Sequence, residues 1–166
     1  IACKNNKLEI AKWLVSIILD NVKRDRHGSL WYPFHTTDGL LNACEKGYID
    51  IVKWILTDNL QYINTYIRGY ERYNKLYYYY GVAFRTACEY GHLELAKWLY
   101  SIKPDIDLSI ENDMCFKNAC LFNNLEMAKW LLEKNSNINI SGNEEYIFRN
   151  VCGYGNLEMA KWLLEK

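Results

Sequence analysis

The sequence is poor in the features that divide a chain into loosely joined or membrane-bound parts. It has 2 prolines and 9 glycines in 166 residues, and no stretch of the composition that is typical of an interdomain linker. Its longest apolar runs, such as residues 13–19, are far too short to cross a bilayer, and no signal-peptide pattern is present. We therefore expect a folded chain of about the length of one domain, without a membrane-spanning segment. Because the chain starts at Ile1 rather than at Met, we also expect it to be part of a longer protein.

The chain also has no net charge. The 20 Lys and Arg residues balance 20 Asp and Glu residues, with a sequence pI near 7.0. This balance excludes a chain held to nucleic acid or to an anionic membrane by bulk charge. The 6 cysteines would indicate disulfides only in a small secreted protein, so we expect an intracellular, reducing compartment.

Motifs that carry catalysis or bind cofactors are absent. The sequence has no G-x-G-x-x-G, Walker loop, H-E-x-x-H or G-x-S-x-G motif, and no C-x-x-C pair for zinc. We therefore expect no enzyme, no catalytic residue, no cofactor and no metal. The histidines lie in unrelated contexts, and we expect His92, which fills a turn of the repeat described next, to be structural.

What the sequence does contain is a segment that recurs five times, which we number repeats 1 to 5. Each copy has Ala or Val followed by Cys, then an acidic residue, and then a Lys-Trp pair. The copies start at Ala2, Ala43, Ala87, Ala119 and Val151. The last three start 32 residues apart. The first two connections carry insertions of roughly 9 and 12 residues, and a fixed period of this length is typical of a stacked array.

Each repeat predicts two short helices joined by a sharp turn. The first helix places an aromatic residue or Leu, then Ala or Val, then Cys on one buried face, starting from Leu40, Phe84, Phe116 or Phe148. The turn position is always Gly or Asn, which tolerate the left-handed conformation: Asn6, Gly47, Gly91, Asn123 and Gly155. The second helix is apolar over more than one stripe, so it must be covered on two sides. After it we expect a protruding loop or hairpin, as at 103–107 and 135–139.

Residues that recur in every repeat are expected to be structural. The acidic residue lies three positions before the Lys, which places the two as a pair on the outer face of the second helix. We expect the Trp side chains to pack between repeats rather than to stack on bases. The equivalent cysteines are expected to be small core residues, about 8–10 Å apart and too distant for disulfides or a shared metal. They are Cys3, Cys44, Cys88, Cys120 and Cys152, whereas Cys115 lies outside this set.

The segment from Gly91 to Leu99, Gly-His-Leu-Glu-Leu-Ala-Lys-Trp-Leu, resembles the ankyrin repeat. The chain departs from that family at the start of the first helix, where Met114 to Lys117 replaces Thr-Pro-Leu-His. The variant is similar to the divergent ankyrin arrays of giant DNA viruses of amoebae, the mimivirus-like type. The resemblance implies an all-α, ankyrin-like repeat solenoid that is a non-enzymatic protein-binding scaffold. If the source is viral, it implies the host cytoplasm, with virion association as an option.

We expect a single array over 1–166, a fragment of a longer one. Its units lie near 1–22, 38–64, 82–110, 114–142 and 146–166, with insertions near 23–37 and 65–81. The resemblance implies that a protein partner of unknown identity packs on a concave surface formed by turn residues and first helices. The candidates are Arg85, Glu89, Asn112, Asp113, Lys117, Leu121, Glu144, Glu145 and Arg149.

The second insertion holds an unusual group of tyrosines. Eight lie between Tyr62 and Tyr80, and five of them share one face if the segment is helical. The segment either covers neighbouring repeats, or recognises a protein through its tyrosines, or stacks on nucleic-acid bases. Candidate residues here are Tyr62, Tyr66, Arg68, Tyr70, Arg72, Tyr73 and Tyr77. The first insertion is expected to be a surface loop.

Two other classes of function stay open. One is a structural role through self-association or incorporation in a virion, and the other is service as the targeting arm of a larger enzyme or adaptor. Nucleic acid and membrane are the partners that the sequence favours least, because the net charge is zero and no apolar run can span a bilayer.

Overall fold

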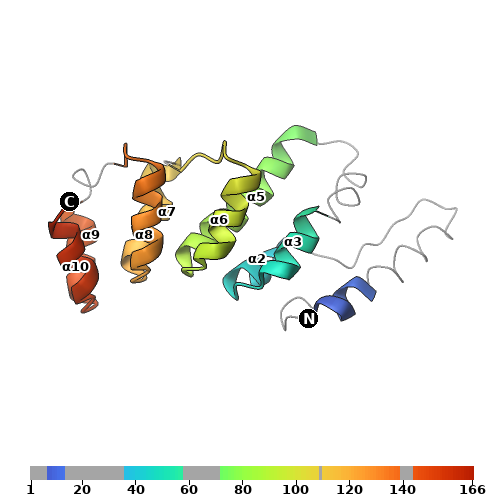
Figure 1. Ribbon diagram of the computed structural model, residues 1–166, viewed down its shortest axis with the longest axis horizontal. Coiled ribbons are helices and arrows are strands. Elements are labelled where there is room, and N and C mark those ends of the chain that lie inside the picture. The colour runs from blue at the N-terminus through green and yellow to red at the C-terminus, as the bar shows by residue number, and fades with distance from the viewer. Residues whose placement is uncertain (1–6, 14–35, 58–71, 109, 139–143) are drawn as a thin grey trace, which may run out of the picture. The chain divides into compact units, whose positions relative to one another are not determined.

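The computed structural model describes residues 7–13, 36–57, 72–108, 110–138 and 144–166 (Figure 1). In the last four of these ranges, side chains are described only from residues 39, 79, 113 and 146 onward. The chain forms two compact units, Ile1–Tyr79 and Tyr80–Lys166, and each is described by itself. The described residues contain helices and turns and no β-strand.

The first compact unit contains a short helix at residues 8–13 and the two helices of repeat 2. Helix α2, Thr36–Glu45, packs against α3, Ile49–Thr57. Leu40, Ala43 and Cys44 form the buried face of α2, at the spacing that the sequence predicts. Helix α3 buries its own aliphatic residues, Ile51, Val52, Ile55 and Leu56.

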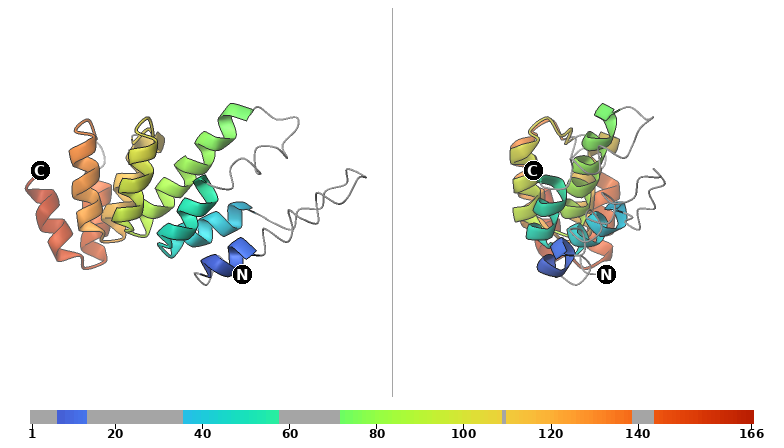
Figure 2. Two further views of the ribbon diagram at one scale, coloured as in Figure 1. Left: turned by 45° about the vertical axis from the view of Figure 1, so that its right-hand side comes forward. Right: turned by 90° about the vertical axis from the view of Figure 1, so that its right-hand side faces the viewer.

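The second compact unit contains repeats 3 to 5. Its helices are α5 Arg72–Glu89, α6 Leu93–Ile102, α7 Ile110–Leu121, α8 Leu125–Lys134, α9 Glu144–Gly153 and α10 Leu157–Leu164. The first helices α5, α7 and α9 lie in one layer, and the second helices α6, α8 and α10 lie in the other (Figure 2). Helix α5 starts within the second insertion and runs without a break into the first helix of repeat 3.

The turns between paired helices have the predicted left-handed residue. The φ angles are 68° at Gly47, 74° at Gly91, 61° at Asn123 and 74° at Gly155. Around Gly91, the amide of His92 donates to the carbonyl of Ala87 at 2.8 Å, and that of Gly91 donates to Cys88 at 3.3 Å. This pair of bonds is the Schellman arrangement, which satisfies carbonyls at the end of a helix. His92 precedes α6 directly, and Asn6 lies outside the described residues.

Neighbouring repeats in the second compact unit are joined by an aromatic contact that recurs. The Trp130 ring of α8 lies 6.2 Å from the Phe84 ring of α5, and the Trp162 ring of α10 lies 6.3 Å from the Phe116 ring of α7. The second-helix Trp of one repeat therefore packs on the first helix of the repeat before it. The prediction of Trp packing is confirmed at these two positions. It is wrong at Trp13, which is 61% exposed.

The connections after α6 and α8 are turns that bury aliphatic residues. Ile106 and Ile138 are buried. The amide of Ile106 donates to the carbonyl of Lys103 at 3.1 Å, and that of Ile138 donates to Asn135 at 3.3 Å. The side chain of Asn135 also accepts from the amide of Asn137 at 3.1 Å. Each turn is thus closed by local hydrogen bonds and held against the core by its Ile.

Four of the five equivalent cysteines lie among the described residues, and they do not all share one environment. Cys44, Cys88 and Cys120 are fully buried, as predicted, and burial raises the pKa of Cys44 and of Cys120 to about 12. Cys152 is exposed, so the prediction of a core residue is wrong there.

Candidate functional site

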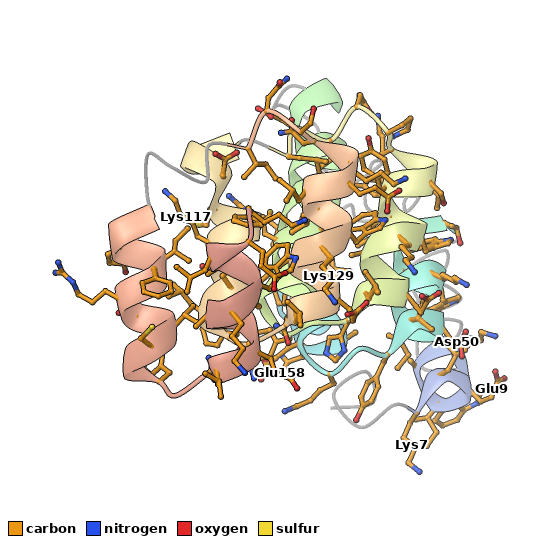
Figure 3. All side chains as sticks on the ribbon, turned by 60° about the vertical axis from the view of Figure 1, so that its left-hand side comes forward. Lys7, Glu9, Asp50, Lys117, Lys129 and Glu158 are labelled. Carbon is orange, nitrogen blue, oxygen red and sulfur yellow. The ribbon has the colours of Figure 1, made fainter. Side chains whose placement is uncertain are left out.

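The outer face of the second helices carries the predicted ion pairs in repeats 1, 3 and 4. The Lys Nζ to Glu Oε1 distance is 3.2 Å for Lys12 and Glu9, 3.1 Å for Lys97 and Glu94, and 2.8 Å for Lys129 and Glu126. All these side chains are well exposed to solvent. Lys129 and Glu158 can be seen on α8 and α10 in Figure 3. An exposed pair of this kind contributes little and gives the face no distinctive chemistry.

The first helices carry one basic residue at the same place in each repeat. We call Arg85, Lys117 and Arg149 the basic row. Arg85 and Lys117 are half-buried and Arg149 is exposed. Figure 3 shows Lys117 on α7. One turn further along α5 and α7, Glu89 and Leu121 are also half-buried. These five predicted residues therefore reach the surface, on the layer opposite the ion pairs.

The predicted turn residues are placed differently from the expectation. Helix α7 begins at Ile110 and α9 begins at Glu144, so Asn112, Asp113 and Glu145 lie within helices rather than in turns. Asp113 has a φ of 60°, and its side chain is only 6% exposed. The prediction that Asp113 lies at an exposed turn is therefore wrong. The side chains of Asn112, Glu144 and Glu145 lie outside the described residues.

The tyrosine-rich insertion is described only in its second part. Residues 72–81 are helical, as the spacing of the tyrosines allows, and they form the start of α5. Tyr79 and Tyr80 are buried, and burial raises the pKa of Tyr80. The other predicted binding residues of this segment lie outside the described side chains: Tyr62, Tyr66, Arg68, Tyr70, Arg72, Tyr73 and Tyr77.

A second row of side chains on the repeats was not predicted. Tyr90, Phe122 and Tyr154 each stand immediately before the left-handed residue of their turn, and we call them the aromatic row. Their exposed fractions are 48%, 58% and 69%. The signal was available in the sequence, because all three precede Gly or Asn at the fixed 32-residue spacing. Large aromatic side chains at protein surfaces are the residue type most enriched in binding hot spots.

One link between repeats fixes the position of Tyr90. The side-chain amide of Asn124, at the start of α8, donates to the backbone carbonyl of Glu89 at 2.9 Å. A methyl group added at Gly91 would collide with the Asn124 side chain. The turn that carries Tyr90 is thus packed tightly against repeat 4, which presents this aromatic side chain from a rigid base.

Cys115 has a partner that the sequence did not reveal. It is buried on α7, and its thiol forms a hydrogen bond with the thiol of Cys88 on α5. Burial, and then this contact, raise the pKa of Cys88 well above its usual value. The equivalent positions in repeats 3 and 5 are Ala83 and Ile147, which are also buried. This position is therefore buried in each of repeats 3 to 5, and the two thiols are part of the packing between α5 and α7.

Within the described ranges, no three His, Cys, Asp or Glu side chains are grouped so that they could hold a metal ion. Among the same residues, no helix is both long enough and apolar enough to cross a membrane.

Comparison with known proteins supports the reading of the repeats. A family model described as ankyrin repeats (many copies) matches residues 84–132 and, in a second placement, residues 116–164. No curated protein and no solved structure matches the chain. Ankyrin repeats are generally protein–protein interaction modules and are typically not enzymes. The expected fold class, an all-α repeat array, is confirmed, and residues 84–164 match the ankyrin-repeat family model.

Proposed function

We propose that this chain is a non-enzymatic scaffold that binds a protein partner across the first-helix layer of repeats 3 to 5. The observation that carries the proposal is the aromatic row. Three large side chains occupy the same exposed position in three successive repeats. Protein interfaces are enriched in Tyr and Phe at their centres, and such residues contribute a large share of the binding free energy.

The side chains around the aromatic row favour the first-helix layer, rather than the outer face of the second helices, as the binding surface. The outer face of the second helices carries paired charges of both signs, which is typical of a solvated surface. The first helices instead carry a basic residue five positions before each aromatic one. A mixed aromatic and basic surface can both exclude water and select the charge of its partner.

The experiment is affinity capture with a triple variant. Tyr90→Ala, Phe122→Ala and Tyr154→Ala together should abolish capture of the partner that the intact chain retains. The matched control is Ile102→Ala, Leu157→Ala and Leu164→Ala, which removes three exposed apolar side chains from the second helices. Both variants should keep the helical circular dichroism and melting temperature of the parent. Equal capture by the triple variant and the parent would reject this surface.

The tyrosine-rich insertion is a second candidate surface in the same function. Its support is compositional, because eight of the chain's 14 tyrosines lie between Tyr62 and Tyr80. Replacing Tyr66 and Tyr70 by Ser leaves the described helices untouched and tests the insertion separately. Loss of capture in this variant alone would move the binding site to the insertion.

A further inference from the structure

Two buried thiols meet where repeat 3 packs on repeat 4. Cys88 lies near the end of α5, Cys115 lies near the middle of α7, and their thiols form a hydrogen bond. The two side chains are 0% and 1% exposed. Helices α5 and α7 belong to the same layer of first helices (Figure 2). The contact therefore brings two nucleophilic groups from different repeats within reach of each other.

Packing alone does not require a cysteine at position 115. The equivalent residues are Ala83 in repeat 3 and Ile147 in repeat 5, and both are buried. Side chains as different in size as Ala and Ile thus fill this position, and neither has a reactive group. Cys88, by contrast, is one of the cysteines that recur in all five repeats. Repeat 4 therefore adds a second thiol directly beside one that the array already has.

The packing of two helices is compatible with a covalent bond between these sulfurs. A disulfide spans Cα atoms about 4.4–6.8 Å apart. Packed helices lie about 8–10 Å apart, and their Cα atoms lie about 2.3 Å from each axis, so directly facing Cα atoms are separated by roughly 3.5–5.5 Å. This interval overlaps the range of a disulfide. The hydrogen bond shows that the side chains of Cys88 and Cys115 do face each other.

Both thiols are protected from oxidation while the two helices are in contact. The thiolate is the nucleophile in thiol–disulfide exchange. Burial, and then the contact with Cys115, keep the pKa of Cys88 well above its usual value, so this thiol stays protonated. An oxidant also cannot reach side chains of which 1% or less is exposed. The reaction therefore requires that α5 and α7 first separate, by the local opening that folded proteins undergo.

We propose that Cys88 and Cys115 are a latent cross-linking site, which forms a disulfide between α5 and α7 when this junction opens in the presence of a small-molecule disulfide. The thiolate of one cysteine attacks the oxidant, whose S–S bond breaks, and one small thiol is released from the mixed disulfide that forms. The second cysteine attacks the protein sulfur of that mixed disulfide and expels the other small thiol. The protein loses two electrons, which the oxidant gains, and the two thiol protons pass to the released thiols.

The cross-link stabilises the junction of repeats 3 and 4. A disulfide between residues 88 and 115 restricts the unfolded chain between them, which favours the folded state. It adds a covalent bond beside the hydrogen bond from Asn124 to Glu89, which already joins the same two repeats. This inference does not depend on the proposed binding function, because it concerns the core of the junction and holds whether or not the aromatic row binds a partner.

The test incubates the full chain with glutathione disulfide at pH 8, without urea and at urea concentrations below the unfolding transition. Peptide mapping by mass spectrometry should find Cys88 linked to Cys115, with the loss of two hydrogen atoms. The rate should rise with urea below the transition, because the reaction proceeds through local opening. The oxidised chain should melt roughly 5–10 °C higher than the reduced chain, and excess reductant should reverse this shift.

Two variants assign the shift to this pair of thiols. Cys115→Ala introduces the residue that repeat 3 has at this position, so the variant should fold, and oxidation should not raise its melting temperature. Cys120→Ala is the matched control, because Cys120 is the buried equivalent of Cys88 in repeat 4, and this variant should keep the full shift. A cross-link that forms only within the urea unfolding transition would overturn the proposal. Glutathione mixed disulfides on the two cysteines in place of the cross-link would overturn it as well, and so would an equal shift in Cys115→Ala.

Discussion

Repeats 4 and 5 contain the same ten residues in two environments. The sequence Leu-Glu-Met-Ala-Lys-Trp-Leu-Leu-Glu-Lys forms α8 at Leu125–Lys134 and recurs at residues 157–166, where it forms α10. Helix α8 lies between α6 and α10 in the layer of second helices (Figure 1). Trp130 is buried in α8, but its counterpart Trp162 is half-buried.

The difference between these two helices separates side chains that pack within their own repeat from side chains that pack against a neighbouring repeat. Met127 and Met159 are both buried, so they pack within their own repeat. Leu157 is 63% exposed, whereas the equivalent Leu125 is half-buried. The same ten residues are therefore helical in both repeats, over ten residues in α8 and over eight in α10, while the burial of the Trp and of the first Leu differs between the two. This is the expected behaviour of a protein whose stability is a sum of repeat and interface contributions.

The largest difference is expected for the first-helix aromatic residues of the two repeats. Phe116 is fully buried against the Trp162 ring, and Phe148 is half-buried. Phe116→Ala should lower the free energy of unfolding by about 3–5 kcal/mol, because it leaves a cavity between repeats. Phe148→Ala should cost about half as much. Urea titrations followed by circular dichroism measure both, and equal losses would contradict the view that the different burial of the two rings sets their contributions.

A second comparison uses the left-handed glycines. Gly91 and Gly155 have the same φ of 74°, but only Gly91 has a neighbour, Asn124, in the space that a methyl group would take. Gly155→Ala should cost about 1–2 kcal/mol through backbone strain. Gly91→Ala should cost about 1 kcal/mol more, because the bond from Asn124 to Glu89 is also disturbed.

The additional cost at Gly91 can be assigned by a double-mutant cycle. With Asn124→Ala already present, the obstructing side chain is gone, and Gly91→Ala should cost no more than Gly155→Ala does. Thermal unfolding of the four proteins gives the coupling free energy. A coupling close to zero would show that the Asn124 contact does not tighten the junction of repeats 3 and 4.

The third comparison concerns the thiols of Cys120 and Cys152. Burial raises the pKa of Cys120 to about 12, whereas a thiol in the unfolded chain has a pKa of about 8.5. Between these values the unfolded state loses its proton first, so stability falls as the pH rises, by about 1.4 kcal/mol per pH unit for this group. Between pH 8.5 and pH 10, this thiol should lower the free energy of unfolding by about 2 kcal/mol, and Cys120→Ala should abolish that part of the decline.

The control for this pH dependence is Cys152→Ala, because that thiol is exposed and the neighbouring sequence is similar. Urea titrations at pH 7, 8.5 and 10 provide the comparison. The interpretation fails if the two alanine variants decline in parallel.

The contrast between repeats 4 and 5 also shows what could be predicted from the sequence. The helix pairs and their turns follow from local rules, because Gly and Asn accept a positive φ and the apolar spacing marks one buried face. The exposure of Trp13 and Cys152 does not follow from these local rules, because Trp130 and Cys120 at the equivalent positions of repeat 4 are buried.

The functional surface was predictable in part. The basic row was identified from its position in the repeat, and the aromatic row is visible once the repeats are aligned on their turns. Asp113 could not be placed, because the start of α7 departs from the family pattern and its carboxylate turns inward. The thiol contact of Cys115 needed the register between α5 and α7, which comes only from the three-dimensional packing.

The smallest effect is expected where the two helices should not differ at all. Lys129 pairs with Glu126 at 2.8 Å on the outer face of α8, and Lys161 occupies the same position on α10. This face is turned away from both neighbouring repeats, so context should have no influence on it. Lys129→Ala and Lys161→Ala should each change the free energy of unfolding by at most about 0.5 kcal/mol, and by the same amount within error. If Lys129→Ala lowers the free energy of unfolding clearly more than Lys161→Ala does, neighbouring repeats also stabilise the outer face. Contacts on that face would then have to be counted among the contacts between repeats.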